Sequence, residues 1–239
     1  NILDVKKKQI QEDLLDNSTL DQIADKIDNK IEGIRLKYVD DTYGEAIQAG
    51  DGIHGLIDSL KEHPEVGTPL YGPLINTVTR GARLKKFYLR SAPTGVGKSR
   101  SMIADACYIA CNEIYDERFG WIHNGTKEST LYIATEQEKS EIQTMMLAFL
   151  SAVNEEHILN GQYIGDEEER VRKAADILAD SPLYIEELPD FSLKDIEDKI
   201  KKNIRDHGVK YVFHDYIHTS LKILEEITRR SGGVKLRED

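Results

Sequence analysis

The sequence contains few cysteines: Cys107 and Cys111 are the only two among its 239 residues. They stand four residues apart in one expected helix, with no other His or Cys nearby at metal-ligand spacing, which argues against a disulfide framework and against a structural metal. We interpret both as small core residues. So low a count is typical of a reducing compartment, and we expect a cytoplasmic protein.

Long apolar runs are also missing. No stretch approaches the roughly 18 consecutive apolar residues of a membrane-spanning helix. The N-terminus has no basic patch followed by an apolar segment, so it shows no secretion signal. We therefore expect no membrane partner. Asn1 is not a natural start, and we expect further residues upstream of it.

Basic residues are in deficit, with 32 Lys and Arg against 43 Asp and Glu and a formal charge of −11. Because a phosphate backbone is bound by concentrated Lys and Arg, this balance excludes a broad nucleic-acid footprint, though not contact through local loops. Hydrophobic residues make up 39% of the chain, which is too many for a disordered protein. The length suggests one full domain with an appendage.

Apolar residues in the N-terminal part recur with a helical period. They predict an amphipathic helix over residues 20–38, preceded by a capping box in which Thr19 and Gln22 would satisfy free backbone N–H groups. Its apolar stripe must be buried against its own domain or a neighbouring subunit. We interpret residues 1–19 as the end of an N-terminal region or linker, and residues 20–66 as this helix with a connecting segment.

Farther along the chain, short apolar strands alternate with helices. We expect strands at 87–91, 131–134, 183–185 and 211–213, and helices near 53–62, through 102–110, and over 138–153, 166–178 and 192–205. This alternation implies crossover connections and an α/β fold with a mostly parallel sheet flanked by helices. Four strands are few for such a fold, so we expect a further C-terminal portion.

Residues 92–99 carry the strongest signal in the sequence. They match the phosphate-binding loop G-x-x-x-x-G-K-[ST], except that Ala92 replaces the first glycine. Gly95 and Gly97 allow backbone conformations that turn successive N–H groups toward phosphate oxygens. An ordinary glycine-rich strand–helix turn is the alternative, but the strand expected before the loop and the helix after it favour nucleotide binding. The predicted nucleotide-binding residues are Ala92, Pro93, Thr94, Gly95, Val96, Gly97, Lys98, Ser99 and Arg100, and the expected ligands are ATP and Mg²⁺, with Lys98 on the phosphates and Ser99 on the metal.

Two acids follow other expected strands. Asp215 ends the apolar run at 211–213, and in phosphate-loop enzymes such an acid holds Mg²⁺, although many strands end in Asp for turn reasons alone. Glu136 follows the strand at 131–134, at the edge where parallel strands open on a ligand crevice, and there it could polarise the attacking water. Glu138 is the alternative acid, and Glu136 starting a helix is the simpler interpretation. We interpret His214 as a core histidine rather than a nucleotide contact.

The loop and the two acids, in this order, resemble the DnaB family of hexameric replicative helicases, which carry a RecA-like ATPase core. The resemblance covers roughly residues 18–239, and the sequence departs from the family pattern at Ala92, Gln137 and His218. Its further parts are the approach to the first strand (Gly67-Thr68-Pro69-Leu70, Leu74-Ile75 and Thr79-Arg80-Gly81), the segments 131–136, 181–185 and 214–217, and the helix at 20–38 in the place of the linker helix that docks on the adjacent subunit.

The resemblance implies a RecA-like ATPase domain over residues 67–239. In it, Lys98 and Ser99 would bind phosphate and magnesium, Glu136 would activate water, and Asp215 would organise the metal. It also implies the motor subunit of a homo-oligomeric, hexameric ring that hydrolyses ATP to move along single-stranded DNA and unwind duplex, with primase and a helicase loader as further partners. The family's sensor strand, arginine finger and second DNA-contacting loop are expected beyond Asp239.

A basic stretch near the end of the sequence is predicted to contact DNA through Arg229, Arg230 and Lys235. A few cations per subunit in a ring would track a single strand, which reconciles DNA contact with an acidic chain. A solvated loop is the alternative interpretation of this stretch. For the whole protein, the alternatives to a helicase are a recombinase-like or other RecA-like ring ATPase, and a non-hydrolysing scaffold gated by nucleotide.

Overall fold

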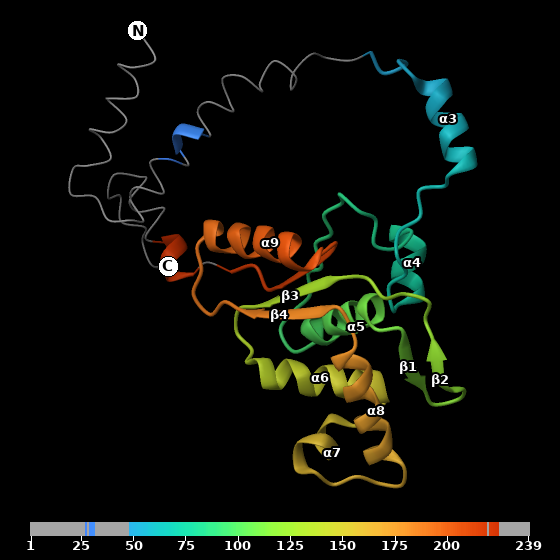
Figure 1. Cartoon of the computed structure of the whole chain (residues 1–239), viewed down its shortest axis with the longest axis vertical. Coiled ribbons are helices and arrows are strands. Elements are labelled where there is room, and N and C mark those ends of the chain that lie inside the picture. The colour runs from blue at the N-terminus through green and yellow to red at the C-terminus, as the bar shows by residue number, and fades with distance from the viewer. Residues whose placement is uncertain (1–26, 28, 32–47, 219, 225–239) are drawn as a thin grey trace, which may run out of the picture. The chain divides into compact units, whose positions relative to one another are not determined.

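The computed structural model describes residues 27, 29–31, 48–218 and 220–224 (Figure 1). The chain divides into two units, residues 1–63 and residues 64–239. In the first unit, α3 (Ile53–Glu62) confirms the short helix expected there. Residues 27 and 29–31 are helical, in keeping with the helix predicted over 20–38, and the rest of that prediction lies outside the described residues.

The second unit is built around a three-stranded parallel sheet in the order β4-β3-β5. The central strand is β3 (Thr130–Ala134), and it pairs with β4 (Leu183–Glu187) and with β5 (Tyr211–Asp215). The register places Ala134 opposite both Glu187 and Asp215. The carboxyl ends of all three strands therefore meet at one edge of the sheet.

Helices cover both faces of this sheet. They are α4 (Pro73–Thr79), α5 (Lys98–Ala110), α6 (Lys139–Ser151), α7 (Glu155–Asn160), α8 (Glu167–Ala179) and α9 (Leu193–His207). Alternate side chains of β3 enter different clusters: Tyr132 and Ala134 pack with α5 and α6, whereas Leu131 and Ile133 pack with α9. Figure 1 shows α9 on one face and α5 with α6 on the other. Every residue of β3 is buried, as in a central parallel strand.

The helices predicted after the phosphate loop and over 138–153, 166–178 and 192–205 are confirmed, as are the strands at 131–134, 183–185 and 211–213. Both cysteines are free and buried in α5 and at its end, which confirms their interpretation as core residues. Among the described residues, no helix is both long and apolar enough to cross a bilayer.

The strand predicted at 87–91 is wrong. These residues form no strand, and Phe87 and Leu89 are 81% and 71% exposed. A cavity of about 440 Å³ is lined by residues 82–92 and by residues 210–217, which include β5. Strand-prone residues form a strand only where a neighbouring backbone offers hydrogen bonds, and here the cavity lies between them and β5. The parallel sheet therefore has three strands in the described residues instead of the expected four.

Other elements were not predicted at all. Besides α4 and α7, they include an antiparallel hairpin formed by β1 (Glu113–Asp116) and β2 (Gly120–His123). The hairpin packs beside α8, where Lys173 lies 4.4 Å above the ring of Trp121. Its short strands mix charged and aromatic residues, so they carry little apolar alternation.

Two glycines allow the backbone to cross itself closely before the phosphate loop. Thr68 and Ala82 form an isolated antiparallel bridge, and the Gly67 N–H donates to the Arg80 carbonyl oxygen at 2.8 Å. A Cβ on Gly67 would lie 2.3 Å from the carbonyl carbon of Ala82, and Gly81, at φ +81°, is equally crowded against Gly67. Only glycine fits at this crossing.

We expect Gly67→Ala to lower the free energy of unfolding by about 2 kcal/mol, because the added methyl group forces the two backbone segments apart. Thermal or denaturant unfolding measures the loss. Gly55→Ala, in the middle of α3 where an added Cβ meets nothing within 4 Å, is the control and should cause no loss. Equal stability of the Gly67 variant and the parent protein would contradict the close crossing.

Candidate functional site

The predicted phosphate loop has the backbone conformation that its glycines allow. Gly95 and Gly97 both adopt positive φ angles, +82° and +91°, and an added Cβ would meet nothing within 4 Å at either. The glycines are therefore needed for conformation rather than for space. Gly97 is the N-cap of α5, so the loop leads straight into the positive end of a helix. This arrangement suits an anion such as a phosphate group.

Lys98 is the first residue of α5. Its ammonium group donates to the Ala92 carbonyl oxygen at 3.0 Å and so spans the loop from its last turn to its first residue. Arg100, two positions later, forms an ion pair with Glu155 of α7. The structure thus directs Lys98 across the loop and links Arg100 to a helix beside it.

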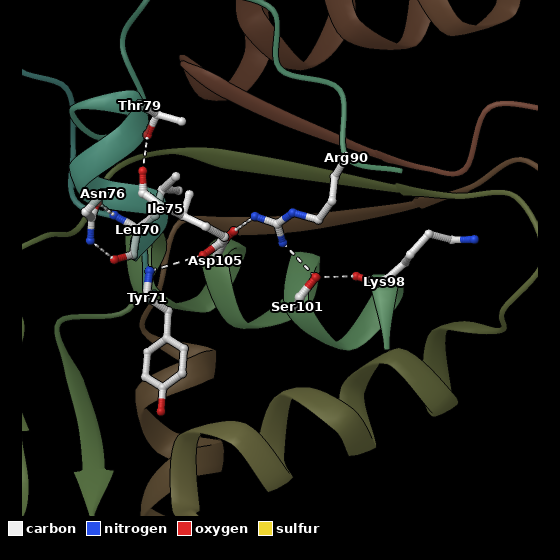
Figure 2. Close-up of polar contacts among 9 residues, drawn as sticks. All are labelled: Leu70, Tyr71, Ile75, Asn76, Thr79, Arg90, Lys98, Ser101 and Asp105. Atoms are coloured by element: carbon white, nitrogen blue, oxygen red, sulfur yellow. Dashed lines mark hydrogen bonds and ion pairs between the residues drawn. The ribbon is translucent and has the colours of Figure 1, made fainter. Parts of the chain in front are cut away.

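A group of charged contacts ties the chain before the loop to α5 (Figure 2). Arg90 donates to a carboxylate oxygen of Asp105 at 2.6 Å and to the Ser101 hydroxyl at 2.7 Å. The other Asp105 oxygen accepts the Tyr71 N–H at 3.1 Å, and the Ser101 hydroxyl donates to the Lys98 carbonyl at 2.8 Å. Figure 2 shows the Lys98 side chain pointing away from these contacts, which hold its backbone.

Sequence analysis missed Arg90 and Asp105. The available signal was a charged residue within an apolar helical stripe: Asp105 lies between two buried alanines and is itself only 3% exposed. A buried carboxylate is costly unless it is paired and hydrogen-bonded. An arginine at the end of the preceding apolar run would have been the natural partner to seek.

The two candidate acids lie at the carboxyl edge of the sheet, as predicted. Asp215 ends β5, is 6% exposed, and stands opposite Ala134 in the register. The Tyr132 hydroxyl donates to its Oδ2 atom at 2.7 Å, and burial, with Asp215 beside it, raises the pKa of Tyr132 well above its usual value. Tyr132 therefore remains a hydrogen-bond donor that fixes the Asp215 carboxylate.

Glu136 lies two residues beyond the end of β3 and is exposed. One of its oxygens, Oε1, accepts a hydrogen bond from the Tyr216 hydroxyl at 2.7 Å. Glu138, the alternative acid, is the N-cap of α6 and shares a capping box with Glu141. Because Glu138 is engaged in capping its helix, the geometry favours Glu136 as the acid that faces a ligand.

His214 belongs to the interior rather than to a ligand site. Its ring packs edge-on against Phe191 at 5.6 Å, and its buried Nε2 has no hydrogen-bond partner among the described residues. Burial, with His218 nearby, lowers the pKa of His214, so the neutral form is favoured. His218 lies 3.4 Å from the Thr135 hydroxyl through Nδ1.

The cavity described above joins the loop to the strand edge. Its lining includes Ala92 and Lys98 from the phosphate loop and Asp215 and Tyr216 from the end of β5. The Lys98 ammonium group lies 5.9 Å from the centre of the Tyr216 ring. The structure therefore brings together Lys98, Asp215, Tyr216 and, through Tyr216, Glu136.

The donors at this edge fit Mg²⁺. In the part of the chain that the structure describes, no group of three or more His, Cys, Asp or Glu side chains could hold a metal ion. Mg²⁺ needs no such group, since it binds through one or two protein oxygens and keeps several waters. The Ser99 hydroxyl lies in the first turn of α5, and in the described contacts Tyr132 engages only one of the two Asp215 oxygens. Both side chains offer the hard oxygen ligands that this ion prefers.

The predicted DNA contacts Arg229, Arg230 and Lys235 lie outside the described residues. Lys222, just before them, contacts Asp190 and Asp195.

Comparison with known proteins places this geometry in context. The model of the DnaB-like helicase C terminal domain family matches residues 73–234. The chain is 40% identical over 240 residues to the SPbeta prophage-derived uncharacterized protein YorI of Bacillus subtilis (strain 168), with 100% of this chain and 47% of the relative covered. The chain thus spans about half the length of this curated relative.

Two solved structures share the fold. One is the ATPase domain of a helicase, with a TM-score of 0.57, 15% identity, and coverage of 80% of this chain and 69% of that one. The other is a DnaB-like replicative helicase whose structure was determined with its interactions with primase; its TM-score is 0.58, its identity 15%, and the coverage 89% and 48%. At this identity the two structures show the fold alone, and they confirm the predicted RecA-like α/β core.

Proposed function

Because the chain belongs to the DnaB-like helicase C terminal domain family, we propose that it is the ATP-hydrolysing motor of a replicative DNA helicase. The observation that carries the proposal is the meeting of Lys98, Asp215 and the Glu136–Tyr216 pair at one edge of the sheet. A phosphate loop alone would support nucleotide binding. The additional buried acid and the exposed glutamate supply what hydrolysis requires.

In this proposal the chain mainly positions charge. The amides of residues 95–99 and the Lys98 ammonium group bind the triphosphate, and the carboxylate of Glu136 accepts a proton from the attacking water. Ser99 and Asp215 would hold Mg²⁺, which when bound neutralises charge that develops on the phosphate oxygens. Phosphoryl transfer needs little covalent participation from protein groups, so exact placement of these side chains sets the rate.

The finer parts of the proposal concern the assembly. We propose a hexameric ring in which a neighbouring subunit supplies an arginine to each nucleotide, and in which Arg229, Arg230 and Lys235 contact single-stranded DNA in the channel. Primase is a candidate partner, since the helicase of one structural neighbour interacts with primase. A helicase loader is a further candidate.

ATP turnover by the intact protein, measured with and without single-stranded DNA, tests the proposal. We expect magnesium-dependent hydrolysis that DNA accelerates at least severalfold, together with separation of a forked duplex. Glu136→Gln is the matched control, because it keeps the shape of the side chain but removes its basicity, and it should bind ATP without turning it over.

The outcomes separate the proposal from its alternatives. Hydrolysis without any unwinding would favour another RecA-like ring ATPase, to which the shared fold applies equally. Full function with Glu136→Gln would instead indicate a scaffold that nucleotide binding gates without hydrolysis.

A further inference from the structure

Tyr216 makes a contact that the proposed function does not use. It directly follows Asp215 at the end of β5, whereas Glu136 follows β3 on the neighbouring strand. The Tyr216 hydroxyl donates to Glu136 Oε1 at 2.7 Å across this gap. A residue next to the candidate magnesium ligand therefore holds the candidate water-activating carboxylate.

Both ends of this contact are anchored by Thr135. The Tyr216 N–H donates to the Thr135 hydroxyl oxygen at 3.1 Å, and that hydroxyl donates to the Asp215 carbonyl at 3.0 Å. Thr135 is 4% exposed and immediately precedes Glu136. The backbone on each side of the contact is thus fixed to the other, and only the Glu136 side chain is left to turn.

The ring of Tyr216 also faces the phosphate loop. Lys98 lies over it, 5.9 Å from its centre, at a distance where a cation is attracted to an aromatic face. The hydrogen bond to Glu136 raises the pKa of Tyr216, so the hydroxyl stays protonated and remains a donor at neutral pH. Tyr216 therefore stands between the cation and the carboxylate that would act on opposite sides of the reacting phosphate.

We propose that Tyr216 is a positioning residue that holds Glu136 by one carboxylate oxygen and leaves the other to accept a proton from water. The proposal rests on the assignment of Glu136 as the group that activates water. An exposed glutamate otherwise samples several rotamers, of which few place its carboxylate productively. A hydrogen bond to a charged acceptor selects one of them.

Tyr216→Phe in the intact protein tests this role, because it removes the hydroxyl and keeps the ring over Lys98. We expect kcat for ATP hydrolysis to fall about tenfold while KM for ATP changes less than about twofold, as for a contact that acts only in the chemical step. Tyr184→Phe is the control. It removes a hydroxyl from β4, in the same sheet but opposite Leu131 and away from the carboxyl edge, and should leave both constants unchanged.

A second comparison shows whether Tyr216 acts through Glu136. Glu136→Asp keeps a carboxylate but withdraws it from the hydroxyl, so turnover should drop and adding Tyr216→Phe should lower it no further. A further fall of about tenfold in the double variant would overturn the proposal, and so would an increase in KM with unchanged kcat. If Glu136→Gln hydrolyses ATP normally, the assignment of Glu136 itself fails. If it does not, yet Tyr216→Phe is fully active, only the role of Tyr216 fails.

Discussion

Lys98→Ala is expected to lower ATP turnover by about three orders of magnitude, which is the cost of removing one preorganised charge from a site where negative charge develops. Lys98 opens α5, spans the phosphate loop to Ala92 and lines the same cavity as Asp215. Alanine leaves the loop amides in place but removes the cation that meets the phosphates. Steady-state hydrolysis by the intact protein with magnesium, with and without single-stranded DNA, measures the loss.

Two further variants make this result specific. Lys98→Arg keeps the charge but replaces a compact ammonium group with a planar fork, so we expect it to recover little of the rate. Lys127→Ala removes an equally long cation whose partner is Asp180, outside the site, and should leave turnover within about twofold of the parent. Turnover by Lys98→Ala close to that of the parent would show that the loop does not bind the reacting nucleotide.

The elements that sequence analysis found correctly are those with strong local patterns. The helix after the phosphate loop and the helix at 192–205 have clear apolar periods, and Ser192 caps the latter through a capping box with Asp195. The meeting of Glu136 and Asp215 at one edge followed from the alternation of strands and helices alone. Parallel strands joined by crossovers must place their carboxyl ends together.

Failures arose where structure depends on partners distant in sequence. Residues 87–91 have a local strand pattern, but a strand also needs a neighbouring backbone, and the cavity beside β5 separates them from one. The hairpin of β1 and β2 turns at Gly120, at φ +73°, between segments with mixed polarity. Neither the absence of pairing in the first case nor its presence in the second is encoded locally.

The supporting contacts of the site were also hidden from the sequence. The phosphate loop, Glu136 and Asp215 could be predicted because their chemistry appears in short motifs. Tyr132 and Tyr216 act through geometry across neighbouring strands, with hydroxyls 2.7 Å from Asp215 and Glu136. Such a contact depends on register, which only the folded sheet fixes.

Asp105→Asn should lower the free energy of unfolding by about 3 kcal/mol, the scale found when one partner of a buried ion pair is removed. Each Asp105 oxygen accepts one hydrogen bond, from Arg90 and from the Tyr71 N–H. Asparagine has the same shape but only one acceptor, so one of these donors would face its NH₂ group. Thermal unfolding should show a fall in Tm of about 6–12 °C for a domain of this size.

The size of this effect depends on burial, which a surface pair tests directly. Asp180→Asn breaks the ion pair with Lys127, but Asp180 is 78% exposed, so water replaces the lost partner and stability should change by less than about 1 kcal/mol. Because Arg90 also holds Ser101, and Ser101 holds the Lys98 carbonyl, the Asp105 variant should bind nucleotide more weakly as well as unfold earlier. Equal stability of the two variants would mean that Asp105 is not the buried anchor of the segment before the loop. A large loss of stability with unchanged nucleotide affinity would instead show that the anchor serves the fold without setting the position of Lys98.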